Sequence, residues 1–152
     1  GVAGDVMGQD CLKMQALHDP DEIVLDEEMA RATAPFAQKP GDVTALRDKL
    51  LDVMWEDVGV MRDADGLQRG LHRIDKIDDE LSSTGVAADN LAFNLSWHDW
   101  LNLRSLVDMS RVIAQSALSR ENSRGAHFRE DHPDTGVAVA VNIQTFQRSP
   151  SF

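Results

Sequence analysis

The middle of the chain carries three successive segments in which apolar residues recur at every third or fourth position. In the first segment, 43–62, these residues are Leu46, Leu50, Val53, Met54, Val58 and Met61. This spacing places one apolar stripe along an α-helix. The segments 67–81 and 87–119 repeat the pattern. Three helices that must each bury one face, joined by short connections, predict an all-α, antiparallel three-helix bundle.

Breaks on either side of these helices divide the chain into three parts. The sequence 39–42, Lys-Pro-Gly-Asp, interrupts any helix, and Asp42 is a suitable N-cap for the helix that follows. We therefore predict an N-terminal helical extension over 1–40. A helical domain arranged like a spectrin repeat should follow over 41–134, with a strand-like tail over 135–152.

Local patterns refine this division. The extension contains two helical candidates, 2–17 and 26–34, each ended by a proline. Polar residues in the first half of the third bundle helix predict a kink or a 3₁₀ turn near Trp97. In the tail, β-branched residues alternate over 137–143, which is a strand pattern.

Composition excludes several classes of function. With 15 basic and 26 acidic residues, the net charge is −11, which disfavours binding to nucleic acid and to anionic membrane surfaces. No apolar run is long enough for membrane insertion. The single cysteine, Cys11, cannot form an internal disulfide, which fits a cytoplasmic protein. The chain starts without Met, so we expect it to be part of a longer protein.

The residues offer few arrangements suited to catalysis or metal binding. The segment 127–132 holds two histidines and two acidic residues, but charged loop residues usually face water, so we predict no metal site. A metal-dependent enzyme that uses His127 and His132 remains an alternative. His98 and Asp99 are adjacent on a helix and point about 100° apart, so a surface or interface role is favoured.

The tryptophans and the paired acids have simpler interpretations. Trp55, Trp97 and Trp100 are typical of a core or of a domain interface. Asp78 and Asp79 indicate a solvated helix face, because catalysis by paired carboxylates would require burial.

The segment 120–133, Arg-Glu-Asn-Ser-Arg-Gly-Ala-His-Phe-Arg-Glu-Asp-His-Pro, is the most distinctive part of the chain. Gly125 suits a helix C-terminal position with positive φ. Arg124 and Arg129 can each form forked contacts with carboxylates or carbonyls. The residues alone predict either a helix exit that docks on a neighbouring surface or a solvated loop.

This segment resembles the run R-x-E-S-R-G-A-H-x-R-x-D-x-P of fumarate reductase and succinate dehydrogenase flavoproteins, to which L-aspartate oxidases carry a related run. Asn122 stands where the family has Glu directly before the serine. The order and lengths of the three preceding helices also resemble the C-terminal domain of this family, so the likeness covers about 43–133. The segment 1–17 is similar to the last helix of the family's FAD-binding domain.

The resemblance implies a parent enzyme that binds FAD and either interconverts succinate and fumarate or oxidises an acid such as aspartate. The family's dinucleotide fingerprint, FAD-linking histidine and catalytic arginine have no counterpart in this sequence. It therefore implies no catalytic, cofactor-binding or metal-binding residue here, and an isolated chain that is inactive and flavin-free. Arg124, His127 and Arg129 match the motif, and the resemblance implies a structural or interface role for them against the flavin domain.

The same resemblance implies partners. They are the flavin-binding domain or subunit and an iron–sulfur subunit, through which the chain would be held at a membrane. The apolar residues of 2–17 have no evident partner in the bundle, so we expect this segment to pack on the bundle or to form a homo-oligomer. The alternative to all of these is an independent acidic helical interaction module.

Overall fold

The computed structural model describes residues 2–13, 19, 21–87 and 90–136. It divides into two units, Gly1–Thr33 and Ala34–Phe152. The division falls earlier than the sequence break at 39–42, because residues directly after Thr33 are hydrogen-bonded to the bundle. The predicted strand over 137–143 lies outside the described residues.

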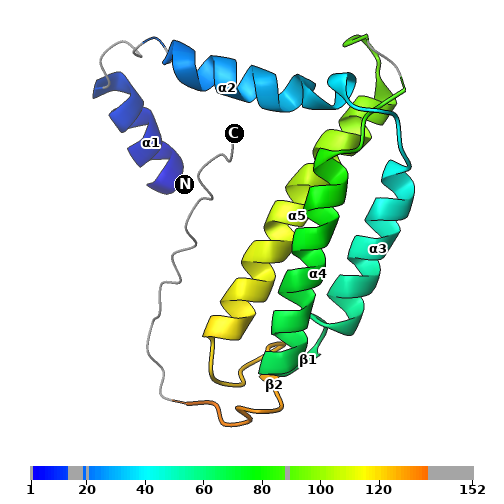
Figure 1. The fold of residues 1–152 in the computed structure, drawn as a ribbon. Coiled ribbons are helices and arrows are strands. Elements are labelled where there is room, and N and C mark those ends of the chain that lie inside the picture. Colours follow the sequence, from blue (N-terminus) through cyan, green and yellow to red (C-terminus); the bar gives the residue numbers. More distant parts are fainter. Residues whose placement is uncertain (1, 14–18, 20, 88–89, 137–152) are drawn as a thin grey trace. The chain divides into compact units, whose positions relative to one another are not determined.

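The larger unit is the predicted antiparallel bundle. Its helices are α3 (Val43–Glu56), α4 (Ala64–Ser82) and α5 (Leu95–Ser119). They run side by side in alternating directions (Figure 1), and α4 packs against both of the others. The chain is mostly helical, so the all-α prediction is confirmed.

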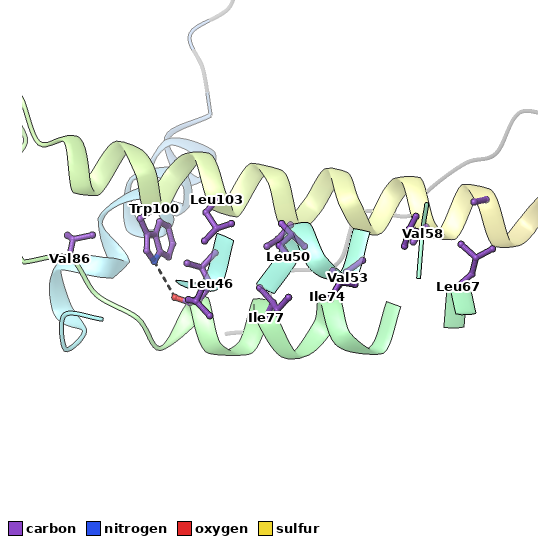
Figure 2. Packing of buried hydrophobic residues seen from close by; sticks show 14 residues of the cluster. Leu46, Leu50, Val53, Val58, Leu67, Ile74, Ile77, Val86, Trp100 and Leu103 are labelled. Atoms are coloured by element: carbon purple, nitrogen blue, oxygen red, sulfur yellow. Dashed lines mark hydrogen bonds between the residues drawn. The ribbon is translucent and has the colours of Figure 1, made fainter. Parts of the chain in front are cut away.

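The core lies along the faces that the apolar spacing predicts. Figure 2 shows side chains from all three helices meeting along the bundle. The buried apolar residues are Leu46, Leu50, Val53, Val58, Leu67, Ile74, Ile77, Leu81, Val86, Trp100, Leu103, Val107, Ala114 and Ala117. Burial of such side chains contributes roughly 1.5–3 kcal/mol each for the larger ones, so this stripe is what makes the bundle form.

Side-chain caps set where the helices begin. Asp42 accepts a hydrogen bond from the Ala45 amide (2.9 Å), as expected, and Asp63 caps α4. The third helix was predicted from residue 87, and this is wrong. It begins at Leu95, because Asn94 is its N-cap. The Asn94 side chain accepts a hydrogen bond from the Trp97 amide (3.0 Å) in the first turn. The predicted kink at Trp97 is therefore the helix start.

The first bundle helix ends earlier than predicted. The apolar spacing continues to Met61, but α3 stops at Glu56, and the chain turns into a short strand, β1 (Met61–Arg62). This strand pairs in parallel with β2 (Phe128–Arg129), which follows α5. A two-residue strand leaves no periodic signal, so the pairing was not predicted.

Buried ion pairs join the helices. Asp78, predicted to face solvent, is 3% exposed and meets Arg111 (2.7 Å) and Arg104 (3.2 Å) of α5. Asp57 follows α3, is 4% exposed, and meets Arg69 and Arg73 of α4, each at 2.8 Å. Sequence patterns miss such acids because burial depends on the neighbouring helix, which brings the guanidinium groups.

The segment before α3 is attached to the turn after α4. The short helix η1 (Ala34–Ala37) contains buried Pro35, whose carbonyl accepts from the Val86 amide (3.2 Å). The indole of Trp100 donates to the carbonyls of Leu81 (3.2 Å), in the last turn of α4, and Thr84 (2.9 Å), in the turn that follows. Trp100 is thus a core residue, in line with its predicted class.

The smaller unit contains α1 (Val2–Lys13) and α2 (Glu22–Thr33). The first matches the helix predicted over 2–17 as far as Lys13, and 14–17 lies outside the described residues. The second begins four residues before the predicted start. The Asp21 carboxylate accepts from the Ile23 amide (3.0 Å) there, which supports the first turn.

Candidate functional site: the loop after α5

The distinctive segment forms a loop, residues 120–136, which we call the exit loop. It lies at the end of the bundle where β1 and β2 pair (Figure 1). Arg124 and His127 exchange two backbone hydrogen bonds, of 2.8 and 3.2 Å. Gly125 has a φ of 62° between them. Positive φ is confirmed, but the position is wrong: Gly125 is in a tight turn, since α5 already ends at Ser119.

Ser123 joins the two sides of the exit loop. Its hydroxyl accepts from the Arg129 amide (2.8 Å) and donates to the His132 carbonyl (2.8 Å), and its own amide donates to the Asp134 carbonyl (2.9 Å). The residue is 6% exposed, so water cannot readily replace these bonds. Ser123 therefore determines the shape of the loop.

Replacing Ser123 with alanine should lower the free energy of unfolding by about 1–3 kcal/mol, because a buried donor and a buried acceptor lose their partner. Urea denaturation of the two proteins measures the difference. Ser119→Ala is the matched control, since that hydroxyl is exposed and bonds only within its own helix. Equal losses from both substitutions would contradict the assignment.

Arg129 caps the C-terminus of α5. Its Nη1 donates to the carbonyls of Ala117 and Leu118, each at 3.0 Å, and to that of Arg120 at 3.4 Å. The last carbonyls of a helix have no partner within the helix and carry a partial negative charge. A guanidinium supplies both the donors and the opposite charge. Arg129 is 1% exposed, so this contact is part of the domain interior.

Asp131 connects Arg129 to α4. Its two carboxylate oxygens accept from Nε and Nη2 of Arg129, each at 2.7 Å, which is a bidentate pair. The same carboxylate accepts from the amide of Ala64, the first residue of α4 (3.0 Å). The Arg129 guanidinium holds the pKa of Asp131 well below its usual range. The pair thus links the negative end of α5 to the positive end of α4.

His127 connects the exit loop to β1. The Arg62 guanidinium donates to Nδ1 (2.8 Å), and Nε2 lies 3.2 Å from the Arg120 carbonyl. Because a guanidinium can only donate, Nδ1 is the acceptor and Nε2 carries the proton, which makes the imidazole neutral. Arg62 also donates to the carbonyls of Val58 (3.0 Å) and Gly59 (2.5 Å) after α3.

The surroundings of His127 favour this neutral form. Burial lowers its pKa below the ordinary 6.5, and the positive charges of Arg62, Arg120 and Arg129 lower it further, while the bond to the Arg120 carbonyl acts in the opposite direction. Protonation would also place an N–H against the Arg62 donor. The loop is therefore held best when His127 is uncharged.

Stability should consequently fall on acidification. The unfolded imidazole takes up a proton as pH drops through about 6.5, whereas the folded one resists until lower pH, so stability is lost across that window. His127→Gln retains an acceptor and a donor but does not titrate. Urea denaturation at about pH 7.5 and about pH 5.5 should show a smaller loss for this variant. Exposed His72→Gln is the control, and equal losses in wild type and His127→Gln would contradict the expectation.

The structure brings the three predicted site residues into one loop but gives them different surroundings. Arg129 and His127 are buried within the domain, whereas Arg124 is exposed and donates to the Thr135 carbonyl (3.1 Å). The interface role of these residues stays a prediction. The hydrogen bonds described above support the structural role that was predicted as its alternative. Arg62 was missed by sequence reasoning, because nothing in its own segment indicates a partner 65 residues away.

The other candidates lie elsewhere. Within the described part of the chain, no three His, Cys, Asp or Glu side chains converge as metal ligands. His98 is exposed and lies beside the Trp97 ring, at 5.5 Å between centroids. Trp55 is 84% exposed, so of its two predicted roles only an interface is compatible with this structure.

A surface cavity of about 380 Å³ lies beside the start of α3 and that of α5. Asp42 and Asp99 are among the residues that line it, together with Thr44 and Ser96. Two carboxylates would repel the pyrophosphate of FAD, so these residues do not fit that cofactor. No cofactor contact is assigned to them.

No helix in the described ranges is both long and apolar enough to cross a membrane.

Comparisons with known proteins agree with the fold and the loop. Residues 47–146 match the family model described as fumarate reductase flavoprotein C-term. A protein of Methanocaldococcus jannaschii named as an uncharacterized FAD-dependent oxidoreductase is 31% identical over 93% of this chain and 26% of its own length. An L-aspartate oxidase of Ralstonia nicotianae is 42% identical over 58% of this chain and 15% of its own length.

The structure of Mycobacterium smegmatis Sdh1 in complex with UQ1 is similar, with a TM-score of 0.70 and 26% identity over 80% of this chain and 21% of that one. The chain thus spans about a quarter or less of these relatives. With the bundle, the exit loop and the family match in agreement, the chain belongs to the family of C-terminal domains of fumarate reductase-type flavoproteins.

Proposed function

We propose that this chain is the C-terminal helical domain of a longer FAD-dependent oxidoreductase of the fumarate reductase and succinate dehydrogenase type. In that protein the domain braces the flavin-binding domain and offers surface to partners, and it is not catalytic alone. The exit loop carries the proposal, because it combines the family motif with a rigid set of contacts at one end of the bundle. The family match over residues 47–146 supports it.

The reaction belongs to the flavin-binding region of the longer protein. Its substrate is a dicarboxylic acid, either succinate or fumarate or an amino acid such as aspartate, and FAD is its redox cofactor. The candidate partners are that flavin region and an iron–sulfur subunit, which would hold the assembly at a membrane. Self-association through the apolar residues of 2–17 is the second kind of contact that we propose.

Within this scheme each site residue has its own structural role. Arg129 and Asp131 hold the ends of α5 and α4, with bonds of 2.7–3.0 Å, and His127 holds the exit loop against β1. These contacts give the loop one conformation. Of the three predicted site residues, Arg124 is the exposed one and is therefore the proposed contact with the flavin domain.

A direct experiment compares the longer protein with this chain. The coding sequence before Gly1 should encode an FAD-binding region, and the purified longer protein should show a flavin spectrum. The isolated chain, mixed with FAD, should show no binding by equilibrium dialysis and no fumarate reduction. A coding sequence without such a region, or tight FAD binding by the isolated chain, would overturn the proposal.

The independent acidic interaction module is not favoured. Its support was the charge and the bundle pattern alone, which many unrelated proteins share. The family match includes the exit loop as well as the helices.

A further inference from the structure

The outer surface of α5 lacks charge over most of its length. Within residues 100–119 the only charged side chains are Arg104, Asp108 and Arg111. Both arginines pair with Asp78 of α4, at 3.2 and 2.7 Å, and Asp108 pairs with Arg111 at 3.4 Å. The three residues are spaced by four and three positions, so they share the side of α5 that faces α4. The rest of this helical surface is uncharged, in a chain that carries 26 acidic and 15 basic residues.

The opposite side of α5 carries a stripe that we call the α5 seam. Its members are spaced by four and three positions in turn, and they are Asn102, Leu106, Met109, Ile113 and Ser116. They lie two positions from the charged residues, and two positions along a helix turn through about 200°. The three apolar members are 45%, 56% and 44% exposed, whereas Val107 and Ala114 of the same helix are buried. The core of the domain therefore does not cover the α5 seam.

The composition of the α5 seam is that of a contact between helices. Its spacing is the heptad spacing by which one helix packs along another. Protein interfaces are depleted of charge at their centres and enriched in methionine. The exposed face of α4 shows the contrast, because its residues include Asp65, Arg69, Lys76, Asp79 and Glu80. A helix face of that kind is suited to water, and the α5 seam is suited to a second helix.

Charge indicates which helix the α5 seam can meet. The chain has a net charge of −11, so two copies repel each other across most of their surfaces. A neutral stripe is the place where two such chains can approach. A partner of different sequence could instead carry basic groups that complement the acidic surface, and it would not require a neutral face. The absence of charge along this face of α5 therefore favours a second copy of the same chain.

The two ends of the α5 seam carry opposite charges. Asp99 lies three positions before Asn102, and Arg120 lies four positions after Ser116, so both continue the spacing. In a parallel pair of α5 helices, like charges would meet at each end. In an antiparallel pair, the Asp99 end of one copy lies beside the Arg120 end of the other. The Asp99 side chain is 57% exposed, and Arg120 bonds to the neutral Asn122 side chain (3.1 Å), so donors remain on its guanidinium.

We propose that the α5 seam binds the α5 seam of a second copy of this chain, with the two helices antiparallel. The two-fold axis lies near Met109, so Leu106, Met109 and Ile113 of one copy meet the same residues of the other. Asn102 and Ser116 flank this apolar centre on both sides. Each copy uses the same surface, so the contact closes on itself and gives a dimer.

Sedimentation equilibrium of this chain tests the contact. The wild type should have twice the monomer mass of 16.8 kDa. Met109→Glu places like charges at the two-fold axis and should weaken dimerisation by at least about tenfold. Gln68→Glu makes the same charge change at an exposed position of α4 and should leave the dimer intact. A monomeric wild type, or an equally stable dimer of Met109→Glu, would overturn the proposal.

A variant in α1 separates this contact from the self-association proposed for residues 2–17. Met7 is exposed on α1, and Met7→Glu should leave the dimer through the α5 seam intact. Dissociation by Met7→Glu, together with no effect of Met109→Glu, would support the contact through residues 2–17 and overturn the α5 seam. The proposal does not rest on the proposed function, so a longer protein without flavin would leave it standing.

Distances between spin labels test the antiparallel direction in chains with Cys11→Ser, and they do not require a destabilised dimer. Ser105 and Ser119 are exposed on α5, four and ten positions from Met109. At 1.5 Å per residue, labels on Ser119→Cys should lie about 30 Å apart and those on Ser105→Cys below about 20 Å. Two short distances would show a parallel pair and overturn the proposed arrangement.

The longer protein provides the last measurement. Met109→Glu and Gln68→Glu, made in that protein, should again differ, with only the first dissociating the dimer. A monomeric longer protein would show that another part of it covers the α5 seam, and this result would overturn the proposal.

Discussion

Replacing Gly85 with alanine is expected to lower the free energy of unfolding of the bundle by at least about 3 kcal/mol. A Cβ at this position would lie 2.1 Å from the Gln38 carbonyl oxygen and 2.7 Å from that of Pro35. Both obstacles are backbone atoms, so no side-chain rotation can relieve the overlap. The backbones are also hydrogen-bonded to each other, since Gly85 donates to the Lys39 carbonyl (2.9 Å). The segment before α3 must therefore separate from the turn after α4.

Urea denaturation followed by circular dichroism measures this loss. Gly8→Ala is the matched control, because an added Cβ there meets nothing within 4 Å and alanine favours the surrounding helix. The attached segment should also become sensitive to protease in Gly85→Ala, with cleavage between Ala34 and Gly41. Wild-type stability of Gly85→Ala would mean that the two segments are not joined as described.

The second large effect is expected for Arg129→Gln, which should lower the free energy of unfolding by about 2–4 kcal/mol. The substitution leaves the last carbonyls of α5 without their donor in a buried site. It also leaves Asp131 without its cation. The loss should be largest near neutral pH, because the depressed pKa of Asp131 keeps that carboxylate charged and its stabilising contribution disappears only as pH falls below about 3.8.

Two variants separate the contributions to this effect. Arg129→Lys keeps the positive charge but loses the planar guanidinium that donates to Asp131 and to the α5 carbonyls at once. This variant should therefore lose less stability than Arg129→Gln but more than none. Arg31→Gln removes an exposed pair with Glu28 and should change stability by less than about 1 kcal/mol. If Arg129→Gln cost no more than Arg31→Gln, the cap on α5 would not stabilise the domain. Amide exchange of the last turn of α5 would locate the change.

The bundle was predictable because its apolar residues follow the helical period without interruption. Leu46, Leu50 and Val53 are buried where the spacing places them, and so are Ile74 and Ile77. Helix ends were predicted less well. The same period that reveals α3 continues through Val58, which is buried although the helix has already ended. Burial follows the period as far as Val58, because a turn can bury an apolar residue as well as a helix can, but Met61, the next residue in the period, is 66% exposed.

The candidate site was likewise predictable only in part from the sequence. The motif pointed to the exit loop and to Arg124, His127 and Arg129. It did not show that Arg129 caps α5, because that contact depends on where the loop returns to the helix. Arg62 carried no signal of its own, since its partner lies in a distant segment.

The sequence alone determined the class of the domain, its family and the position of the exit loop, because these follow from local spacing and from a contiguous motif. Only the tertiary structure decided which charged residues are buried and what they bond to. Asp78 and Asp57 look like ordinary surface residues in the sequence, and Arg129 is distinguished there only by its place in the motif, yet each is buried against groups that come from another element. The reason is physical: a helical stripe needs only its own residues to be recognised, whereas an ion pair or a cap requires two segments to meet.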